Sequence, residues 1–336
     1  MLIPPIIGSL YETVFAIGIA PKDRQAMITR RTLLLGAGAA MLAKGATAQV
    51  SGSASTSLSL WPAKPPGGGG PAGPTQVSKT GAVSQIAMPA LEVIQPDRPN
   101  GAAMLVAAGG GYKRIQMGKE AQPAARWLAD RGITAFMLSY RLPGEGWNAG
   151  ALAPLQDAQR ALRVIRSRAA QDHLDPVRIG VLGFSAGGHL MGLAATRSSF
   201  RSYDPVDELD TLSARPAVAA LIYPVITLQP PYDRTSARRV LIGRHPDPAA
   251  SAEWSVETHV RAGNPPVFLV QAADDPISNP ENTVIMARTC EQAGVPVECH
   301  RLPSGGHGFG MGQPGSPTAD WPGWYEAWLR RSGMIA

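Results

Sequence analysis

The sequence predicts an α/β fold: a single domain in which a doubly wound, mostly parallel β-sheet is flanked by helices. From about residue 77 onward, short apolar runs alternate with helix-length amphipathic segments. Buried parallel strands have such apolar runs, and the helices that connect them carry one apolar stripe. Glycine-rich turns also follow two of the apolar runs directly, at the strand ends where ligand sites form in such sheets.

The same alternation places the individual elements. We expect strands at residues 102–107, 133–139, 178–184, 217–223, 267–272 and 297–302. We expect helices at residues 122–131, 155–169, 186–196, 279–293 and 321–330. The segment 155–169 shows the helical pattern, because Leu155, Ala158 and Leu162 fall on one stripe. Residues 224–264 are rich in proline and arginine, and we expect a helix and a lid-like excursion there.

The composition is that of a globular chain. Of the 336 residues, 44% are apolar and 17% are charged, a balance that suits a large hydrophobic core and excludes wholesale disorder. The net charge is +6, of which +3 lies within residues 1–48, where there are five basic and two acidic residues. No run of lysine and arginine indicates a nucleic-acid interface, so we expect no nucleic-acid partner.

The N-terminal part of the chain indicates export. The pair Arg30-Arg31, followed by the apolar stretch 33–43, is typical of a twin-arginine (Tat) signal, and Ala46 and Ala48 are the small residues that a signal peptidase recognises. We therefore expect the Tat machinery to deliver the protein to the periplasm or the exterior, with cleavage after Ala48. The apolar stretch is far shorter than the roughly 20 residues that span a bilayer, so we expect no stable membrane insertion. The alternative is a cytosolic N-terminal helix with a chance arginine pair.

The chain thus divides into three segments. Residues 1–48 are the expected signal region, and Met27, just before the arginine pair, is the expected true start. Residues 49–76 are rich in serine, then in proline and glycine, and predict a linker or loosely attached arm, from which Trp61 docks on the domain. Residues 77–336 form the expected α/β catalytic domain.

Two cysteines, Cys290 and Cys299, have a spacing that suits neither a zinc site nor a redox motif. An oxidising compartment would allow them to pair, but two buried thiols, on a helix and the next strand, are the expectation. No motif implies a metal or an organic cofactor.

Ser185 is the candidate nucleophile. It lies at the centre of a G-x-S-x-G pattern, Gly183-Phe184-Ser185-Ala186-Gly187, between an expected strand and an expected helix. Small flanking residues allow the sharp turn that presents the hydroxyl, and the following helix directs its positive end at a developing oxyanion. The alternative, a glycine-rich turn with an incidental serine, is disfavoured because two partner motifs follow in the right order.

Backbone amides for that oxyanion are expected from two segments. Gly109-Gly110-Gly111-Tyr112 follows the expected strand that ends at Ala107, and acyl transfer needs N–H groups aimed at a developing negative oxygen. We expect the amides of Gly110, Gly111 and Ala186 to be the donors. A merely flexible turn is the alternative for the glycine run.

The general base is expected after Ser185, because the order in this arrangement is serine, acid, histidine. His307 is the candidate, since it lies in a glycine-rich loop beyond the last expected strand. His300, inside that strand, and His189, in the helix after Ser185, are expected to pack structurally.

The acid is expected at Asp274-Asp275, directly after the strand 267–272, where a carboxylate would orient the imidazole. We predict Asp274, because an Asp-x-x-Ile pattern aligns it with Ile277. The alternative is Asp275, for which we expect a turn or capping role before the proline that follows.

Together these motifs resemble the esterase and lipase branch of the α/β-hydrolase fold, specifically the bacterial acetyl-xylan and feruloyl esterase-like (BD-FAE-type) group. The resemblance spans about residues 58–331 and includes further segments: Leu60-Trp61-Pro62, Ser139-Tyr140-Arg141-Leu142-Pro143, Asp157-Ala158-Gln159-Arg160-Ala161 and Tyr223-Pro224. It implies a triad of Ser185, Asp274 and His307, an acyl-enzyme and no cofactor. It also implies a short acyl ester as substrate, expected to be an acetyl group on a plant polysaccharide such as xylan or on its oligosaccharides.

The chain departs from that group at Ala108, where relatives carry histidine or proline, and at Gln271-Ala272, where many carry His-Gly. Neither change removes a catalytic group, although both bear on the substrate. One alternative is a serine peptidase or formamidase of the same fold; such peptidases commonly have a large additional domain, for which this chain has no room. Another is a non-catalytic carbohydrate-binding protein on a hydrolase scaffold, which would typically lack one of the three triad residues.

Three further groups have structural interpretations. We expect Arg141 and Asp157 to form a buried ion pair beneath the site. Glu120 is expected at a helix start, where the helix dipole favours a negative charge. The tryptophans near the C-terminus (Trp321, Trp324 and Trp328) are expected to pack a helix rather than to bind sugar.

Overall fold

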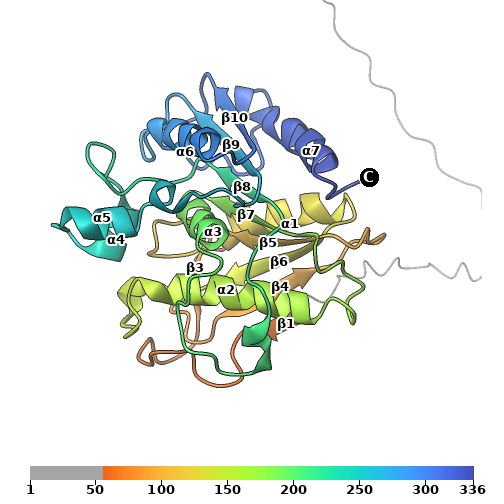
Figure 1. The fold of residues 1–336 in the computed structure, drawn as a ribbon, viewed down its shortest axis with the longest axis vertical. Helices are drawn as coiled ribbons and strands as arrows, with labels where there is room; N and C mark the ends of the chain where they lie inside the picture. The colour runs from red at the N-terminus through yellow and green to blue at the C-terminus, as the bar shows by residue number, and fades with distance from the viewer. Residues whose placement is uncertain (1–55) are drawn as a thin grey trace, which may run out of the picture. The chain divides into compact units, whose positions relative to one another are not determined.

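Residues 56–336 are described by a computed structural model of the protein, shown in Figure 1. The central sheet contains β1 (Thr56–Ser59), β4 (Ala90–Ile94), β5 (Ala103–Ala107), β6 (Thr134–Ser139), β7 (Ile179–Phe184), β8 (Ala219–Ile222), β9 (Val267–Ala272) and β10 (Val297–Leu302). Their spatial order is β1-β4-β6-β5-β7-β8-β9-β10. The strands from β6 to β10 in this order are parallel, whereas β4 is antiparallel to β6 and β1 is antiparallel to β4. A small separate sheet joins β2 (Gln76–Val77) and β3 (Val83–Ser84).

Helices flank the central sheet (Figure 1). The α-helices are α1 (Gln122–Ala129), α2 (Leu152–Ser167), α3 (Ala186–Thr196), α4 (Ser236–Ile242), α5 (Pro248–Glu253), α6 (Glu281–Gln292) and α7 (Trp321–Arg331). A π-helical turn, η1 (Met117–Ala121), leads into α1, and the short 3-10 helices are η2 (Pro143–Glu145), η3 (Glu208–Thr211), η4 (Glu257–His259) and η5 (Pro317–Ala319). Helix α1 packs on β6, α3 on β7 and β8, and α6 on β9 and β10.

The predicted alternation of strands and helices is confirmed. Strands β5, β7, β8 and β9 are buried along their whole length, as expected for apolar runs covered on both faces. The helix 186–196 and the strands 267–272 and 297–302 have the predicted bounds. Within 224–264, the expected helix is present as two short helices, α4 and α5.

The segment expected to be a linker or arm contributes to the sheet. Residues 56–59 form the edge strand β1, paired with β4, so the folded unit begins earlier than residue 77. Trp61, which was expected to dock, is 3% exposed and donates a hydrogen bond from Nε1 to Asp157 Oδ1 at 2.9 Å. The expected signal region, residues 1–48, and residues 49–55 lie outside the described part of the chain.

The expected ion pair between Arg141 and Asp157 is present, with both side chains fully buried and 3.0 Å apart. Asp157 also accepts from the Arg141 amide at 2.8 Å, and Arg141 Nη1 donates to the carbonyl of Pro66 at 2.8 Å. Because Trp61 contacts the same carboxylate, one buried cluster attaches the segment after β1 to helix α2.

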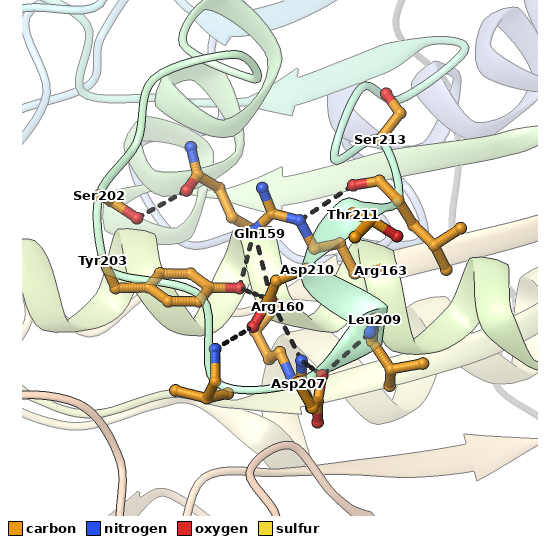
Figure 2. A network of polar contacts seen from close by, with 12 residues as sticks. Gln159, Arg160, Arg163, Ser202, Tyr203, Asp207, Leu209, Asp210, Thr211 and Ser213 are labelled. Carbon is orange, nitrogen blue, oxygen red and sulfur yellow. Dashed lines mark hydrogen bonds and ion pairs between the residues drawn. The ribbon is translucent and has the colours of Figure 1, made fainter.

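A second polar network attaches the loop after α3 to the same helix (Figure 2). Arg160 of α2 forms ion pairs with Asp207 and Asp210, at 2.5 and 3.1 Å. Arg163, one turn further along, donates to the Tyr203 hydroxyl at 2.7 Å. Arg160 Nε donates to the carbonyl of Leu60 at 2.8 Å, so this network also reaches the segment after β1.

The two cysteines are free thiols, Cys290 buried on α6 and Cys299 exposed on β10. The expectation of two buried thiols is therefore right for Cys290 and wrong for Cys299, which lies on the edge strand of the sheet. In residues 56–336, no helix combines the length and the apolar character needed to cross a bilayer.

Candidate active site

Ser185 lies at the sharp turn between β7 and α3. Its backbone is left-handed, with φ 53° and ψ −117°, a strained conformation that L-residues adopt at functional turns. The turn requires its glycines: a Cβ on Gly183 would lie 2.3 Å from the carbonyl oxygen of Gly187, and a Cβ on Gly187 would lie 2.1 Å from that of Ala107. The pattern around Ser185 therefore produces the local geometry that it predicts.

His307 is brought to this serine by the loop that follows β10. Its Nε2 is 2.8 Å from Ser185 Oγ, although the two residues are 122 positions apart in the chain. The imidazole is 15% exposed, and its ring packs edge-on against the Tyr223 ring at a centroid distance of 5.0 Å. This hydrogen bond is the contact that a base needs to take a proton from a serine hydroxyl.

The acid that contacts His307 is Asp275, and the prediction of Asp274 is wrong. Asp275 Oδ2 lies 2.7 Å from His307 Nδ1, and the Asp275 side chain is fully buried. Its Oδ1 accepts from the amides of Ile277 and Ser278, at 2.8 and 2.9 Å. The turn role expected for Asp275 is therefore also present, with one oxygen closing the turn and the other holding the imidazole.

Asp274 points to a different partner. It is exposed, and its Oδ1 accepts from the amides of Gly305 and Gly306, at 2.9 and 2.8 Å. The sequence signal that favours Asp275 is Gln271, four residues before it on β9, whose Nε2 donates to Asp275 Oδ2 at 2.7 Å. The departure at Gln271 noted above therefore bears directly on this acid.

The predicted oxyanion donors surround the serine. Gly110, Gly111 and Ala186 line, with Ser185 and His307, one cavity of about 570 Å³. Within residues 56–336, the amides of these three donors have no hydrogen-bond acceptor. Unpaired amides of residues that line a cavity beside a serine hydroxyl are candidates for binding an oxyanion.

The rest of the cavity lining is mostly polar. It includes Lys113, Arg114, Gln116, Lys119, Thr235 and Ser236, together with the apolar residues Val225, Ala237 and Ile277. The excursion predicted within 224–264 thus contributes to the site through α4 and the residue before it.

Glu120 is a component of the site that the sequence did not reveal. It lies in the π-helical turn η1 that leads into α1, at a helix start as expected, and its side chain is buried. Its Oε2 accepts from the Gly109 amide at 2.6 Å, and its Oε1 accepts from the Tyr223 hydroxyl at 3.0 Å. A single-turn π-helix is a common feature of functional sites, but η1 has no sequence signature that distinguishes it from the start of α1.

His189 and His300 pack within the structure, as predicted. The ring nitrogens of His189 lie 2.9 Å from the Tyr112 hydroxyl and 2.7 Å from the Trp254 carbonyl, and burial lowers the pKa of His189 to about 4. His300 stacks on Trp324 at a centroid distance of 4.6 Å and contacts Glu298. Of the C-terminal tryptophans, Trp321 and Trp328 are buried, in agreement with helix packing.

Comparisons with known proteins agree with this architecture. The sequence profile of the BD-FAE family matches residues 91–289. The acetylxylan esterase of Xylanibacter ruminicola is 30% identical over 223 residues, which cover 65% of this chain and 43% of that protein. Endo-1,4-beta-xylanase B of Butyrivibrio fibrisolvens is 33% identical over 207 residues, covering 61% of this chain and 32% of that protein. The chain thus spans less than half the length of these two curated relatives.

Solved structures extend the similarity over most of the described residues. The acetyl ester-xyloside bifunctional hydrolase of Caldicellulosiruptor lactoaceticus has a TM-score of 0.70 and 31% identity, covering 84% of this chain and 98% of that one. A thermophilic esterase of Thermogutta terrifontis shares the fold, with a TM-score of 0.63, 23% identity and coverage of 78% and 95%. A parallel sheet flanked by helices, a serine at the β7–α3 turn and a profile match over more than half of the chain lead to one conclusion: the chain belongs to the BD-FAE family and has the α/β-hydrolase fold.

Proposed function

We propose that the protein is a serine carboxylic-ester hydrolase, with Ser185 as nucleophile, His307 as general base and Asp275 as the acid that orients the base. The observation that carries the proposal is the continuous chain of hydrogen bonds from Ser185 Oγ through His307 to Asp275, at 2.8 and 2.7 Å. Nucleophile, base and orienting group in this relation define acyl-transfer sites on unrelated folds.

The proposed cycle begins when His307 Nε2 accepts the proton of Ser185 Oγ as that oxygen attacks the ester carbonyl. The negative charge that develops on the carbonyl oxygen is stabilised by the amides of Gly110, Gly111 and Ala186. His307 then gives its proton to the departing alkoxide, which leaves an acyl-serine. Water, activated by the same imidazole, adds to the acyl group and releases the carboxylic acid. Asp275 faces the imidazolium through both proton transfers.

The proposed substrate is a short acyl ester, with acetyl as the acyl group and a xylan-type polysaccharide or oligosaccharide as the alcohol. Two named similarities support this choice, the acetylxylan esterase and the acetyl ester-xyloside hydrolase. The polar lining of the cavity supports it independently, because a long acyl chain would need more apolar surface than Val225, Ala237 and Ile277 provide.

The test is hydrolysis of p-nitrophenyl acetate, butyrate and octanoate by the purified protein, with Ser185→Ala as the matched control. We expect turnover to fall with acyl length and Ser185→Ala to lose roughly 10⁶-fold in kcat, as when a triad serine is removed elsewhere. Activity that survives in Ser185→Ala would reject the assignment of the nucleophile. Acetate turnover no faster than octanoate turnover would reject the short-acyl substrate class.

Additional substrates and a binding measurement separate the alternative activities. A peptidase or formamidase would turn over an aminoacyl p-nitroanilide or N-formyl substrate in preference to the acetate ester. A non-catalytic carbohydrate-binding protein would bind acetylated xylo-oligosaccharides without releasing acetate.

We propose in addition that the protein is exported through the Tat machinery. This proposal rests on the Arg30-Arg31 pair, the apolar stretch that follows it and the Ala46/Ala48 cleavage pattern. An exported enzyme would have direct access to a polysaccharide substrate.

A further inference from the structure

Glu120 is a buried carboxylate in the active-site cavity that takes no part in the cycle described above. It is 5% exposed and lies among the residues that line the cavity with Ser185 and His307. Within residues 56–336, no arginine, lysine or histidine nitrogen is within 4.0 Å of its oxygens. A buried acid without a cationic partner is costly to retain unless its charge or its hydrogen bonds have another use.

The two hydrogen bonds of Glu120 connect the two loops that carry the site. Oε2 accepts from the amide of Gly109, which immediately precedes the oxyanion donors Gly110 and Gly111. Oε1 accepts from the Tyr223 hydroxyl, which in turn accepts from the amide of Gly310 in the histidine loop at 3.0 Å. The oxyanion loop and the histidine loop are thus linked through this carboxylate.

The Tyr223 side chain extends the link to the base itself. Its ring lies edge-on to His307 and, at a centroid distance of 4.4 Å, to Phe309. Tyr223 has a left-handed backbone, with φ 37°, a strained conformation found where a side chain has a specific task. Movement of Glu120 would therefore remove a hydrogen bond from Tyr223, whose ring packs against the His307 imidazole.

The two hydrogen bonds of Glu120 favour an ionised carboxylate, whereas its burial opposes the charge. Each oxygen accepts one hydrogen bond, from the Gly109 amide and from the Tyr223 hydroxyl. Burial raises the pKa of Glu120, whereas those two hydrogen bonds and the charges of His307 and Lys119 act to lower it. Burial and, after it, the charge of Glu120 raise the pKa of Tyr140 and of Tyr223. His307 is contacted by Asp275 at Nδ1, and Glu120 lines the same cavity as His307.

We infer that Glu120 is a positioning residue for the proposed ester hydrolysis: it ties the oxyanion loop to the histidine loop and supplies a second negative charge near the imidazolium of His307. The inference rests on the proposed function of Ser185 and His307. It assigns Glu120 no contact with the substrate and no proton transfer.

Two variants separate the charge from the link. In Glu120→Gln, the amide oxygen retains the Gly109 hydrogen bond and the amide nitrogen can donate to the Tyr223 oxygen, so the negative charge is lost while the link is kept with the direction of the Tyr223 hydrogen bond reversed. In Glu120→Ala, both hydrogen bonds are lost and the Gly109 amide is left unpaired. We expect kcat for p-nitrophenyl acetate to fall about tenfold in Glu120→Gln, less than the 10²–10³ lost with a direct oxyanion donor, and further in Glu120→Ala. KM should change little in Glu120→Gln.

The pH profile is the readout that a purely structural role would not move. A negative charge favours the protonated imidazole, so the acidic limb of kcat/KM should shift to lower pH in Glu120→Gln. Stability should change in the opposite sense to activity. Above its raised pKa, the buried carboxylate of Glu120 opposes folding, so Glu120→Gln should have a Tm at neutral pH at least as high as that of the wild type. Below the ordinary carboxyl pKa, the difference in Tm in favour of Glu120→Gln should disappear, because the Glu120 side chain is then protonated in both the folded and unfolded states.

Glu145 provides the matched control. Its carboxylate also accepts two hydrogen bonds, here from the backbone amides of Gln85 and Ile86 at 2.5 and 2.9 Å, but it does not line the cavity. Glu145→Gln should leave kcat and the pH profile unchanged. Wild-type kcat and an unshifted profile in Glu120→Gln would overturn the inference, and so would a loss of activity that merely parallels a loss of Tm.

Labelling of Ser185 by a fluorophosphonate gives the same comparison without an ester substrate. The labelling rate depends on the Ser185–His307 pair, so Glu120→Gln should lower it and shift its pH dependence in the same direction. Labelling or ester hydrolysis that persists in Ser185→Ala would instead reject the proposed function. Activity that depends on Ser185 but is indifferent to Glu120→Gln would reject only the positioning role.

Discussion

Two adjacent aspartates at the end of β9 stabilise different backbone segments. Asp275 lies inside the protein, where it accepts hydrogen bonds from Gln271 and from two amides of its own turn as well as contacting His307. Asp274 lies at the surface and accepts from the two glycine amides that precede His307. Both carboxylates thus act on the histidine loop, one on the imidazole and one on the backbone.

We predict that Asp275→Asn lowers kcat by roughly 10⁴-fold, because an amide at this position favours the wrong imidazole tautomer and removes the charge that stabilises the imidazolium. Asp274→Asn is the matched control. Its side-chain oxygen can still accept from Gly305 and Gly306, so most of the activity should remain. The measurement is kcat for p-nitrophenyl acetate in both variants, and a larger loss in Asp274→Asn than in Asp275→Asn would contradict the assignment.

At the scale of elements, helix α2 attaches the segment after β1 to the body of the sheet. Asp157 and Arg160 of this helix contact that segment at the Trp61 side chain and the Leu60 carbonyl, respectively. The loop after α3 is attached to the same helix by the network in Figure 2. Strand β1 pairs with one neighbouring strand, and the buried polar contacts of the segment that follows it help to hold it on the sheet.

We predict that Asp157→Ala lowers the free energy of unfolding by about 3–5 kcal/mol, because Arg141 would be left as an unpaired charge in the protein interior. Asp204→Ala is the control, since its ion pair with Arg201 is exposed on both sides and surface pairs contribute little. The measurement is urea unfolding of both variants followed by circular dichroism. An unchanged free energy of unfolding in Asp157→Ala would show that the buried pair is not needed for stability.

At the scale of the whole molecule, the proposed cleavage site lies before the first strand of the central sheet. Cleavage after Ala48 would leave residues 49–55 ahead of β1, so the mature protein would retain every strand of the central sheet.

We predict that the protein expressed in a bacterium with a Tat system is exported and begins at Gln49, and that replacing the pair Arg30-Arg31 with two lysines blocks export. A chain that starts at Met27 should be exported as efficiently as the full sequence. The measurement is mass spectrometry of the N-terminus in periplasmic and culture fractions. Normal export of the double-lysine variant would contradict the proposal.

The strands and helices that were predicted well are those with a single strong pattern. Strand β9 is a continuous apolar run, and α3 begins directly after the G-x-S-x-G motif. Strands β1 and β4 were not predicted, because they are antiparallel strands with partly exposed residues, β1 at the edge of the sheet and β4 next to it. In β4, buried and half-buried residues alternate over only five positions, which is a weak signal in a single sequence.

For the site, the sequence was sufficient to select Ser185, His307, Gly110, Gly111 and Ala186 as candidates, which the structure places around one cavity, because each lies in a local motif whose backbone geometry follows from its glycines. It was not sufficient to choose between Asp274 and Asp275 or to reveal the contacts of Glu120. Those outcomes depend on the direction that a side chain takes after the chain leaves β9 and on a π-helical turn ahead of α1. Both are decided by packing between distant segments: Asp275 and His307 are more than 30 residues apart, and Glu120 and Tyr223 are more than 100 residues apart. Local sequence patterns carry no information over such separations.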